Sequence, residues 1–196
     1  MRRHGTLRVN NIQYKHIAMS YRFLIAELTD QSFNPTALPP DVTGFRVRKA
    51  ARGILIDGDK IALIHITKKN YHKLPGGGIE GNETPEEGFT REIKEETGCD
   101  CEILDEAGIT MEYRRDHKLL QISYVFFAKV VGVPGQVTFE EGEIEEGAEL
   151  TWIQHDQIKT IFDQNRPMEY EDHFITKRDW EILQYYRNKI LSYNEI

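Results

Sequence analysis

The sequence predicts an α+β protein in which helices pack on the faces of a mixed β-sheet, and three observations lead to this fold class. Strand patterns and helix patterns are interspersed along the chain rather than grouped in blocks. Two strand patterns, at 47–56 and 60–66, are joined by Asp57-Gly58, a strong hairpin signal. A well-delimited helix pattern at 85–97 lies between further strands. Strands and helices in this alternation bury their apolar faces against one another in layers.

The helix pattern at 85–97 has the clearest boundaries in the chain. Thr84 is placed to cap it, Pro85 suits the first helical position, and Glu87 completes a T-x-x-E capping box. Gly98 is placed to end the helix in the left-handed conformation. The residues that precede it, 74–78, read LPGGG and predict a glycine-rich loop.

The second half of the chain carries further strand and helix patterns. Apolar residues alternate with more polar ones between Leu120 and Val130, which is typical of a strand with one apolar face. Thr176 and Asp179 are candidate start signals for the last helix. The expected elements are strands at 99–103, 120–130 and 150–153, an acidic loop at 140–149, and helices near 155–162 and 176–191.

Length and composition indicate one domain with an extension at each end. A chain of 196 residues with 39% hydrophobic and 29% charged residues is typical of a soluble globular protein with a sizeable core. We expect an N-terminal extension at 1–44, a central domain at 45–165, and a C-terminal helix at 166–196 that packs on the domain. The N-terminal extension is a candidate for covering a sheet edge or for forming a homodimer.

Charge and hydropathy exclude several classes of protein. The net charge of −7 disfavours binding to nucleic acid or to an anionic membrane, since both rely on basic surfaces. No apolar run approaches the roughly 18 residues of a membrane span, and no signal peptide is evident. The two cysteines, Cys99 and Cys101, are expected to be reduced thiols in a cytoplasmic protein.

Three glutamates on the predicted helix at 85–97 point to a metal site. Glu92, Glu95 and Glu96 stand at positions i, i+3 and i+4, so their side chains project from one face. Like charges at this spacing repel one another, and they lie near the helix C-terminus, where the helix dipole disfavours anions. A divalent cation would offset both effects, and carboxylate oxygens favour Mg²⁺ or Mn²⁺ over zinc. A solvated acidic helix face is the alternative.

The segment around these glutamates resembles the signature of the Nudix hydrolase family, and in particular its MutT-like members. That signature reads Gly, five residues, Glu, seven residues, then R-E-U-x-E-E-x-G-U, where U is a bulky aliphatic residue. The matching positions in this chain are Gly77, Glu83, Arg91, Glu92, Ile93, Glu95, Glu96, Gly98 and Cys99. Cys99 is the one departure, and a buried thiol behaves as a small hydrophobic residue.

The resemblance implies both a fold and a reaction. The fold is an α/β/α sandwich with a mixed sheet between helices, and the reaction is Mg²⁺-dependent hydrolysis of a pyrophosphate bond in a small nucleotide. Glu92, Glu95 and Glu96 correspond to the family's metal ligands. Glu83 and Arg91 correspond to a pair that braces the junction between loop and helix, a role suited to a charge-assisted hydrogen bond.

The acidic segment at 140–149 is expected to supply one more functional carboxylate. In some relatives the general base is a glutamate of the signature, here Glu92, and in others it comes from a loop before a late strand that carries Trp. Glu146 is the preferred additional ligand and catalytic residue, because its spacing to Trp152 resembles that of MutT-like members. Glu143 and Glu145 remain alternatives, as does a solvated loop.

The glycine-rich segment and its flanks are candidates for binding the substrate. Gly76, Gly77 and Gly78 allow the backbone to approach the substrate phosphates closely. Lysines near this segment can contact phosphate, and aromatic residues can stack on a base. The candidate lysines are Lys68, Lys69 and Lys73, and the candidate aromatic residues are Tyr71 and Tyr113.

Three hypotheses on function remain open. The leading one is hydrolysis of a nucleoside triphosphate or a similar small nucleotide. The second is hydrolysis of ADP-ribose or a nucleotide sugar, although the proline that follows the signature in many ADP-ribose pyrophosphatases is missing; the first proline here is Pro134. The third is a Nudix-like ligand sensor without catalysis, which is disfavoured because Glu92, Glu95 and Glu96 are all present.

Overall fold

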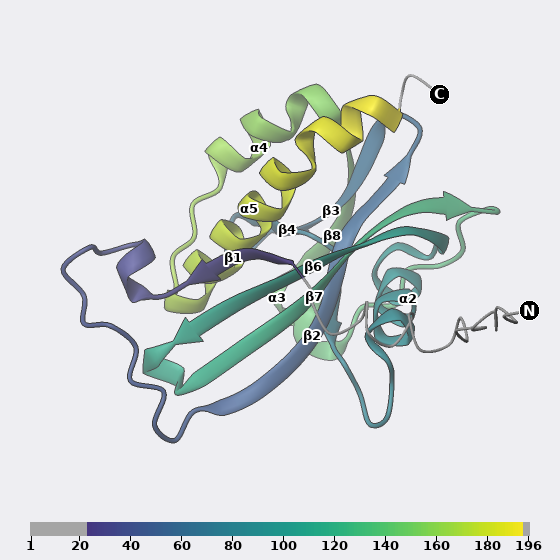
Figure 1. The fold of residues 1–196 in the computed structure, drawn as a ribbon. Helices are drawn as coiled ribbons and strands as arrows, with labels where there is room; N and C mark the ends of the chain where they lie inside the picture. The colour runs from purple at the N-terminus through teal and green to yellow at the C-terminus, as the bar shows by residue number, and fades with distance from the viewer. Residues whose placement is uncertain (1–22, 194–196) are drawn as a thin grey trace, which may run out of the picture.

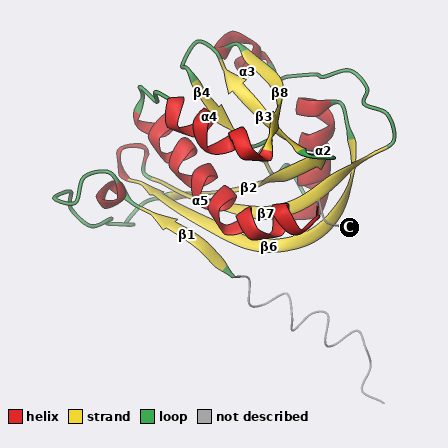
Figure 2. Ribbon diagram, turned by 90° about the horizontal axis from the view of Figure 1, so that it is seen from above, coloured by secondary structure: helices red, strands yellow, loops and turns green. Residues whose placement is uncertain are grey.

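The computed structural model describes residues 23–193, and in this part of the chain eight strands form one mixed sheet with helices on both faces (Figures 1 and 2). The strands are β1 (Leu24–Leu28), β2 (Arg46–Asp57), β3 (Lys60–Ile66), β4 (Tyr71–Lys73), β5 (Gly76–Gly78), β6 (Asp100–Arg114), β7 (Leu119–Val131) and β8 (Ala148–Gln154). The helices are α2 (Pro85–Thr97), α3 (Glu141–Glu146), α4 (Ile158–Gln164) and α5 (Tyr170–Tyr193). Short 3-10 turns lie at η1 (Asp30–Ser32), η2 (Arg115–His117) and η3 (His155–Gln157). The predicted α+β class is confirmed.

The sheet has the strand order β1-β6-β7-β2-β3-β4, with β5 paired to β2 and β8 paired to β3. The long strands β6 and β7 form an antiparallel hairpin, whereas β2 runs parallel to β7 and β1 runs parallel to β6. The predicted hairpin between β2 and β3 is confirmed, with Asp57 paired to Lys60 across a turn in which Gly58 has a φ of 59°. This mixture of pairings agrees with the predicted mixed sheet.

Alternate residues of β2 divide the core between the two faces of the sheet. Ala51 and Leu55 pack with Phe89 and Ile93 of α2 on one face. Ile54 and Ile56, in the intervening positions, pack on the other face in the same cluster as Ile182, Leu183 and Tyr186 of α5. This division follows from the period of two along a strand, which places successive side chains on opposite faces. The result is the expected sandwich, with α2 on one side and α4 and α5 on the other (Figure 1).

The ends of α2 are as the sequence predicts. The Thr84 hydroxyl accepts a hydrogen bond from the Glu87 N–H at 3.2 Å, and the Glu87 carboxylate accepts one from the Thr84 N–H at 2.8 Å. Gly98 ends the helix with a φ of 70°. Both caps satisfy backbone groups that a helix end otherwise leaves without partners, so the register of the helix is set at its two ends.

Three expectations about local structure are wrong. The glycine-rich segment forms strand β5, paired with β2, rather than a loop. The acidic segment contains helix α3, which begins after Glu140 and ends at Gly147 in the left-handed conformation. The last helix begins at Tyr170, six residues before the expected Thr176, with Glu171 and Asp172 in its first turn. Acidic residues favour a helix N-terminus, and in α3 this local effect combines with a capping box between Glu140 and Glu143.

Part of the N-terminal extension belongs to the sheet. β1 lies beside the edge of β6, and Gly108 accommodates the close approach of Phe23, whose backbone oxygen would lie 2.1 Å from a Cβ at that position. Residues 1–22 lie outside the described residues. Both cysteines are free thiols, and none of the described helices is long and apolar enough to cross a membrane.

Candidate active site

Helix α2 presents its three clustered glutamates to very different surroundings. Glu96 is 1% exposed and Glu92 is 8% exposed, whereas the Glu95 side chain is 37% exposed. Burial raises the pKa of Glu92, an effect that the neighbouring Arg91 guanidinium partly offsets. Two buried carboxylates one turn apart on the same helix face are costly without a compensating charge.

Arg91 gathers the carboxylates at one end of this cluster. Its Nε donates to Glu83 at 2.8 Å, and its Nη1 donates both to Glu92 at 3.0 Å and to Glu95 at 2.8 Å. It also donates to the Gly78 carbonyl at 2.7 Å, so it ties helix α2 to strand β5. The hydrogen bond from Arg91 lowers the pKa of Glu83, which stays ionised. This geometry suits the bracing role that the family resemblance implies for Glu83 and Arg91.

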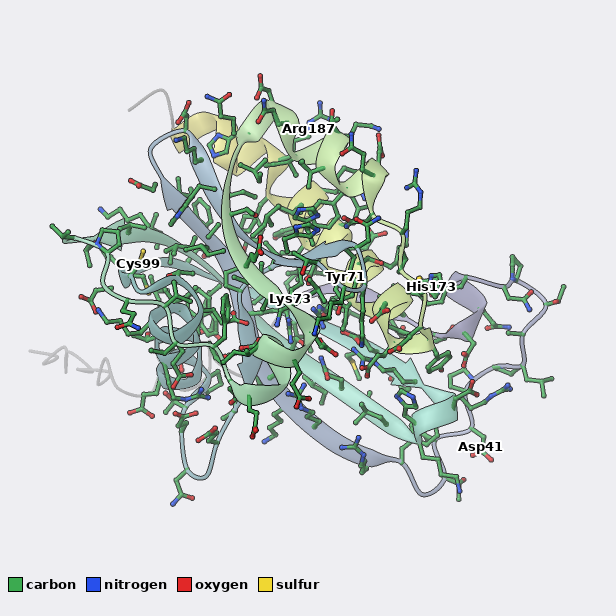
Figure 3. The ribbon with its side chains drawn as sticks, turned by 180° about the vertical axis from the view of Figure 1, so that it is seen from behind. Asp41, Tyr71, Lys73, Cys99, His173 and Arg187 are labelled. Carbon is green, nitrogen blue, oxygen red and sulfur yellow. The ribbon has the colours of Figure 1, made fainter. Side chains whose placement is uncertain are left out.

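Glu96 forms a second cluster with Lys73 and Glu143. The Lys73 ammonium lies 3.1 Å from Glu96 and 2.7 Å from Glu143, and it sits near the centre of the molecule (Figure 3). The other Glu96 oxygen accepts a hydrogen bond from the Gly76 N–H at 2.6 Å. Burial raises the pKa of Glu96 despite the attraction of Lys73. Burial also acts to raise the pKa of Glu143, but the hydrogen bond shared with Glu96 and the charge of Lys73 hold it below its usual value.

Gly77 leaves room for the Glu92 carboxylate where β5 approaches α2. A Cβ at Gly77 would lie 2.4 Å from Glu92 Oε1, which is shorter than any van der Waals contact. At Gly78 a Cβ would meet only the far end of the Arg48 side chain, at 3.2 Å. The absence of a side chain at Gly77 therefore lets the Glu92 carboxylate reach the glycine strand.

Some of these groups line one cavity of about 480 Å³, whereas Glu83, Arg91, Glu95 and Glu96 do not. Among its walls are β5 with Ile79 and Glu80, the carboxylates of Glu92, Glu140 and Glu143, and the ammonium of Lys73. The opposite part of the wall is strongly basic. It is formed by Arg46, Arg48, Arg52, Arg114 and Arg178, with Leu119, Gln121, Glu171 and Ile175.

The structure brings Glu143, rather than Glu146, to the carboxylates of α2. Glu146 forms an ion pair with Lys69 at 2.8 Å, and its side chain is 38% exposed. Helix α3 places the two carboxylates one turn apart along its axis, so Glu143 in the first turn reaches Lys73 while Glu146, the last residue of the helix, lies beside Lys69. Glu145 is exposed, and its backbone carbonyl accepts a hydrogen bond from Lys68.

Of the other candidates for substrate binding, Gly76, Gly77, Gly78 and Lys73 line the cavity, and Lys68 does not. Tyr71 is buried in a core cluster with Ile64 and Ile66. Tyr113 shares a hydrogen bond with Glu27 of β1. Neither tyrosine lines the cavity, so neither is placed to stack on a base there.

Sequence reasoning missed the basic wall of the cavity and the buried ion pairs behind it. Glu112, which is fully buried, pairs with Arg114 and with Arg178, at 2.9 Å from the latter. Asp179 is also fully buried and pairs with Arg178 at 2.7 Å. One signal in the sequence was available, since the arginines of β2 recur at even-numbered positions that continue into the buried Ile54 and Ile56.

The donor set fits a divalent cation that binds oxygen. Among residues 23–193, no three acidic, histidine or cysteine side chains converge on one point, since Arg91 and Lys73 hold the carboxylates in two groups. Glu96 and Glu143 nevertheless face each other closely enough to share a hydrogen bond, and Glu92 is buried beside the glycine strand. Facing carboxylates of this kind favour Mg²⁺ or Mn²⁺. Glu92, Glu95, Glu96 and Glu143 are the residues that could hold such an ion.

Comparison with known proteins agrees with this geometry. Residues 46–173, well over half of the chain, match the family model of the NUDIX domain. The chain is 41% identical over 87 residues to an ADP-ribose pyrophosphatase of Methanocaldococcus jannaschii, an alignment covering 42% of this chain and 51% of that protein. It is 30% identical over 118 residues to an RNA pyrophosphohydrolase of a Sulfurovum species, covering 55% of this chain and 75% of that protein.

A solved structure supports the fold. A hydrolase of the NUDIX family from Clostridium perfringens superposes with a TM-score of 0.50 at 18% identity, covering 70% of this chain and 97% of that one. The chain spans only about half the length of the archaeal ADP-ribose pyrophosphatase. The signature residues lie on β5, on α2 and in the segments on either side of α2, within the matched region. The chain therefore belongs to the Nudix family.

Proposed function

We propose that this chain hydrolyses a pyrophosphate bond in a nucleoside diphosphate that is linked to a second group. The observation that carries the proposal is one cavity lined by Glu92, Glu143, Lys73 and the glycine strand β5, with Glu96 buried behind Lys73 and Gly76. Membership of the Nudix family, and relatives named as pyrophosphatase and pyrophosphohydrolase, support it.

The acidic residues at this site require a cation when a phosphate chain binds beside them. Mg²⁺ or Mn²⁺, when bound, offsets the phosphate charges, polarises the phosphorus–oxygen bonds and lowers the pKa of a coordinated water. We assign the ligands to Glu92, Glu95 and Glu96 of α2 together with Glu143 of α3. We do not assign Glu83 as a ligand but as a positioning residue, because its ion pair with Arg91 holds that guanidinium against Glu92 and Glu95.

The chain's own groups then orient the substrate and accept a proton. Lys73 and the backbone of Gly76–Gly78 line the cavity and position the phosphates. A carboxylate takes a proton from the attacking water as the new phosphorus–oxygen bond forms and the bond to the bridging oxygen breaks. We assign this base to Glu143, since it is held ionised and half-buried beside Glu96. Glu92 is the alternative base.

The group that is linked to the nucleoside diphosphate distinguishes two classes of candidate substrate, nucleoside triphosphates on the one hand and ADP-ribose or nucleotide sugars on the other. A phosphate in that place makes the substrate a nucleoside triphosphate or a similar small nucleotide. A ribose makes it ADP-ribose, and a sugar makes it a nucleotide sugar. The name of the archaeal relative favours ADP-ribose, whereas the name of the Sulfurovum relative refers to RNA. A ligand sensor that binds without cleaving is the rival from a different functional class.

A product assay tests the proposed function directly. The protein is incubated with a panel of nucleoside triphosphates, ADP-ribose and nucleotide sugars, in Mg²⁺, in Mn²⁺, in Zn²⁺ and in excess EDTA. We expect hydrolysis with Mg²⁺ or Mn²⁺, poor hydrolysis with Zn²⁺, and none with the chelator. Undiminished turnover in EDTA would exclude the metal-dependent mechanism.

Variants of helix α2 separate catalysis from folding in the same assay. Glu95→Gln and Glu96→Gln should lower kcat by at least about 10²-fold. Glu95→Gln removes a half-exposed charge among several that repel one another, so the helix should stay folded. Glu96→Gln also loses the buried ion pair with Lys73, so circular dichroism checks that this variant is folded. Glu86→Gln, in the first turn of the same helix, is the matched control and should keep its activity. Activity near wild type in the first two variants would favour the sensor.

A further inference from the structure

Arg52 is a buried cation in the wall of the cavity. Within the described residues no carboxylate forms an ion pair with it, although the charges of Asp179 and Glu112, which Arg178 already holds, lie near enough to attract it. Arg52 is 4% exposed. Within residues 23–193 its side chain makes one hydrogen bond, in which Nε donates to the Ser123 hydroxyl at 3.2 Å. A guanidinium carries five N–H donors, so the terminal nitrogens remain available to a ligand. Burial, reinforced by the nearby charge of Arg178, lowers the pKa of Arg52 to about 9. A buried charge of this kind is costly unless an anion joins it.

The neighbouring arginines divide into two groups. Arg114 and Arg178 are neutralised by the buried Glu112, by Asp179 and by Glu171. Arg48 instead donates to the side-chain oxygen of Gln121 at 2.9 Å, and no ion pair within the described chain involves it. Burial and the charges of Arg114 and Arg178 lower the pKa of Arg48 as well. Arg48 and Arg52 therefore form a cationic pair, held by neutral side chains, which we call the arginine pair.

The arginine pair lies directly beside the carboxylates of α2. Arg52 is paired with Gly76 across β2 and β5, and the Gly76 N–H donates to Glu96. Arg48 lies against Gly78, at the other end of β5. The glycine strand therefore separates the arginine pair from Glu92 and Glu96 without any side chain between them. A phosphate chain that lies along this strand would meet the acidic groups on one side and the arginine pair on the other.

A guanidinium fork matches the geometry of a phosphate and forms strong charge-assisted hydrogen bonds with it. A neutral ribose or sugar in the same place would leave both cations without an ion-pair partner of their own, because Glu112 and Asp179 are already paired with Arg114 and Arg178. A site built to bind a charged group discriminates against a ligand that lacks it. We propose that Arg48 and Arg52 bind a phosphate of the substrate beyond the two that flank the scissile bond, so that the substrate is a nucleoside polyphosphate. This inference rests on the proposed function and names the group linked to the nucleoside diphosphate.

ATP and ADP-ribose provide a matched pair of ligands for the test, because they differ only in the group carried by the second phosphate. In both ligands a methylene group replaces the oxygen between the first two phosphates, so isothermal titration calorimetry of the whole chain in Mg²⁺ measures binding without turnover. We expect wild-type protein to bind ATP at least about 10-fold more tightly than ADP-ribose, given typical strengths of hydrogen bonds to charged groups. Arg52→Gln should weaken ATP binding by about 10- to 100-fold and change ADP-ribose binding by less than about 3-fold.

Two further variants guard against trivial results. Arg48 is only partly buried and is more exposed than Arg52, so Arg48→Gln puts folding at less risk, and it should show the same selective loss for ATP. Arg115→Gln removes a cation outside the cavity, 3.9 Å from Asp116, and should affect neither ligand. Equal binding of the two ligands by wild-type protein, equal effects of Arg48→Gln and Arg52→Gln on both, or no binding of ATP would overturn the inference.

The same proteins, assayed with Mg²⁺, keep this inference distinguishable from the proposed function. The values of kcat/KM for ATP and for ADP-ribose should respond to Arg52→Gln in the same selective way as the dissociation constants. Efficient turnover of ADP-ribose with unselective effects at Arg52 would overturn the arginine pair and leave the pyrophosphatase standing. Selective ATP binding with no turnover of any nucleotide would support the arginine pair and overturn the hydrolytic function.

Discussion

The Asp179 carboxylate on α5 accepts a hydrogen bond from the backbone N–H of Leu74 at 2.8 Å. Leu74 lies two residues before Gly76, whose own N–H donates to Glu96. Asp179 is in turn held by Arg178 at 2.7 Å, and Arg178 pairs with Glu112 on β6. A helix outside the signature thus fixes the strand from which the candidate active site is built.

Asp179→Ala tests this link. The substitution removes a buried carboxylate and leaves Arg178 with one partner fewer, so we expect the free energy of unfolding to fall by about 3–5 kcal/mol, as when one member of a buried ion pair is removed. Urea denaturation followed by circular dichroism measures it. Glu181→Ala, which breaks a more exposed ion pair with Lys177 on the same helix, should cost no more than about 1 kcal/mol. Equal losses of unfolding free energy in the two variants would contradict a structural role for the Asp179 carboxylate.

Glu143 and Glu146 form a matched pair of substitutions in α3. Glu143→Gln removes the carboxylate beside Lys73 and Glu96, and we expect kcat to fall by at least about 10²-fold, the low end of general base catalysis. Glu146→Gln removes only the ion pair with Lys69, and kcat should stay within a few-fold. Steady-state kinetics on the preferred nucleotide measures both. A small effect at Glu143 would return the base role to Glu92, and a large effect at Glu146 alone would restore the register inferred from Trp152.

Gly77 and Gly78 differ in what a methyl group would meet. In Gly77→Ala the new Cβ must displace the Glu92 carboxylate, which would otherwise lie 2.4 Å away. Since Glu92 is a proposed ligand, we expect kcat and the affinity for Mn²⁺ to fall together, by 10-fold or more on the order-of-magnitude scale of a disturbed metal site. Gly78→Ala meets only a flexible end of Arg48 and should keep its affinity for Mn²⁺. Paramagnetic resonance of free Mn²⁺ reads the affinity, and indistinguishable values for the two variants would contradict the argument.

Glu112 should make the free energy of unfolding decrease at acidic pH. Burial acts to raise the pKa of Glu112, but the charges of Arg178, Arg114 and Arg52 hold it below 4.5, its value in the unfolded chain. The unfolded state therefore binds the proton more readily, so the stabilising contribution is complete above about pH 4.5 and is lost as the pH falls through the folded-state pKa.

Glu112→Gln tests this dependence by urea denaturation at several pH values. At pH 7 the variant should lose about 3–5 kcal/mol of unfolding free energy, because Arg114 and Arg178 lose a buried partner. The difference from wild type should shrink as the pH falls below about 4.5. Glu102→Gln, on the exposed face of the same strand and paired with Lys129, should show neither effect. A difference that is constant with pH would exclude a role for the Glu112 charge.

The sequence alone was sufficient for the fold class, the hairpin at Asp57-Gly58 and both ends of α2. These features depend on local signals, namely a period of two, a turn dipeptide and a capping box, which act between residues a few positions apart. The glutamates of the signature belong to the same group, since the spacing of Glu92, Glu95 and Glu96 on a helix already places them on one face.

The tertiary structure decided which residues complete the site. Glu143 reaches Glu96 because residues 141–146 form a helix, and the choice between Glu143 and Glu146 depends on that register. The glycine-rich segment became a strand because β2 offered it hydrogen-bonding partners far away in the sequence. Arg52 becomes a candidate ligand for phosphate only in the folded chain, where β2, β5 and α5 meet. Its burial and its hydrogen bond to Ser123 in place of an ion pair are properties of the packed chain. Long-range contacts of this kind leave no fixed spacing in the sequence, and so no local pattern predicts them.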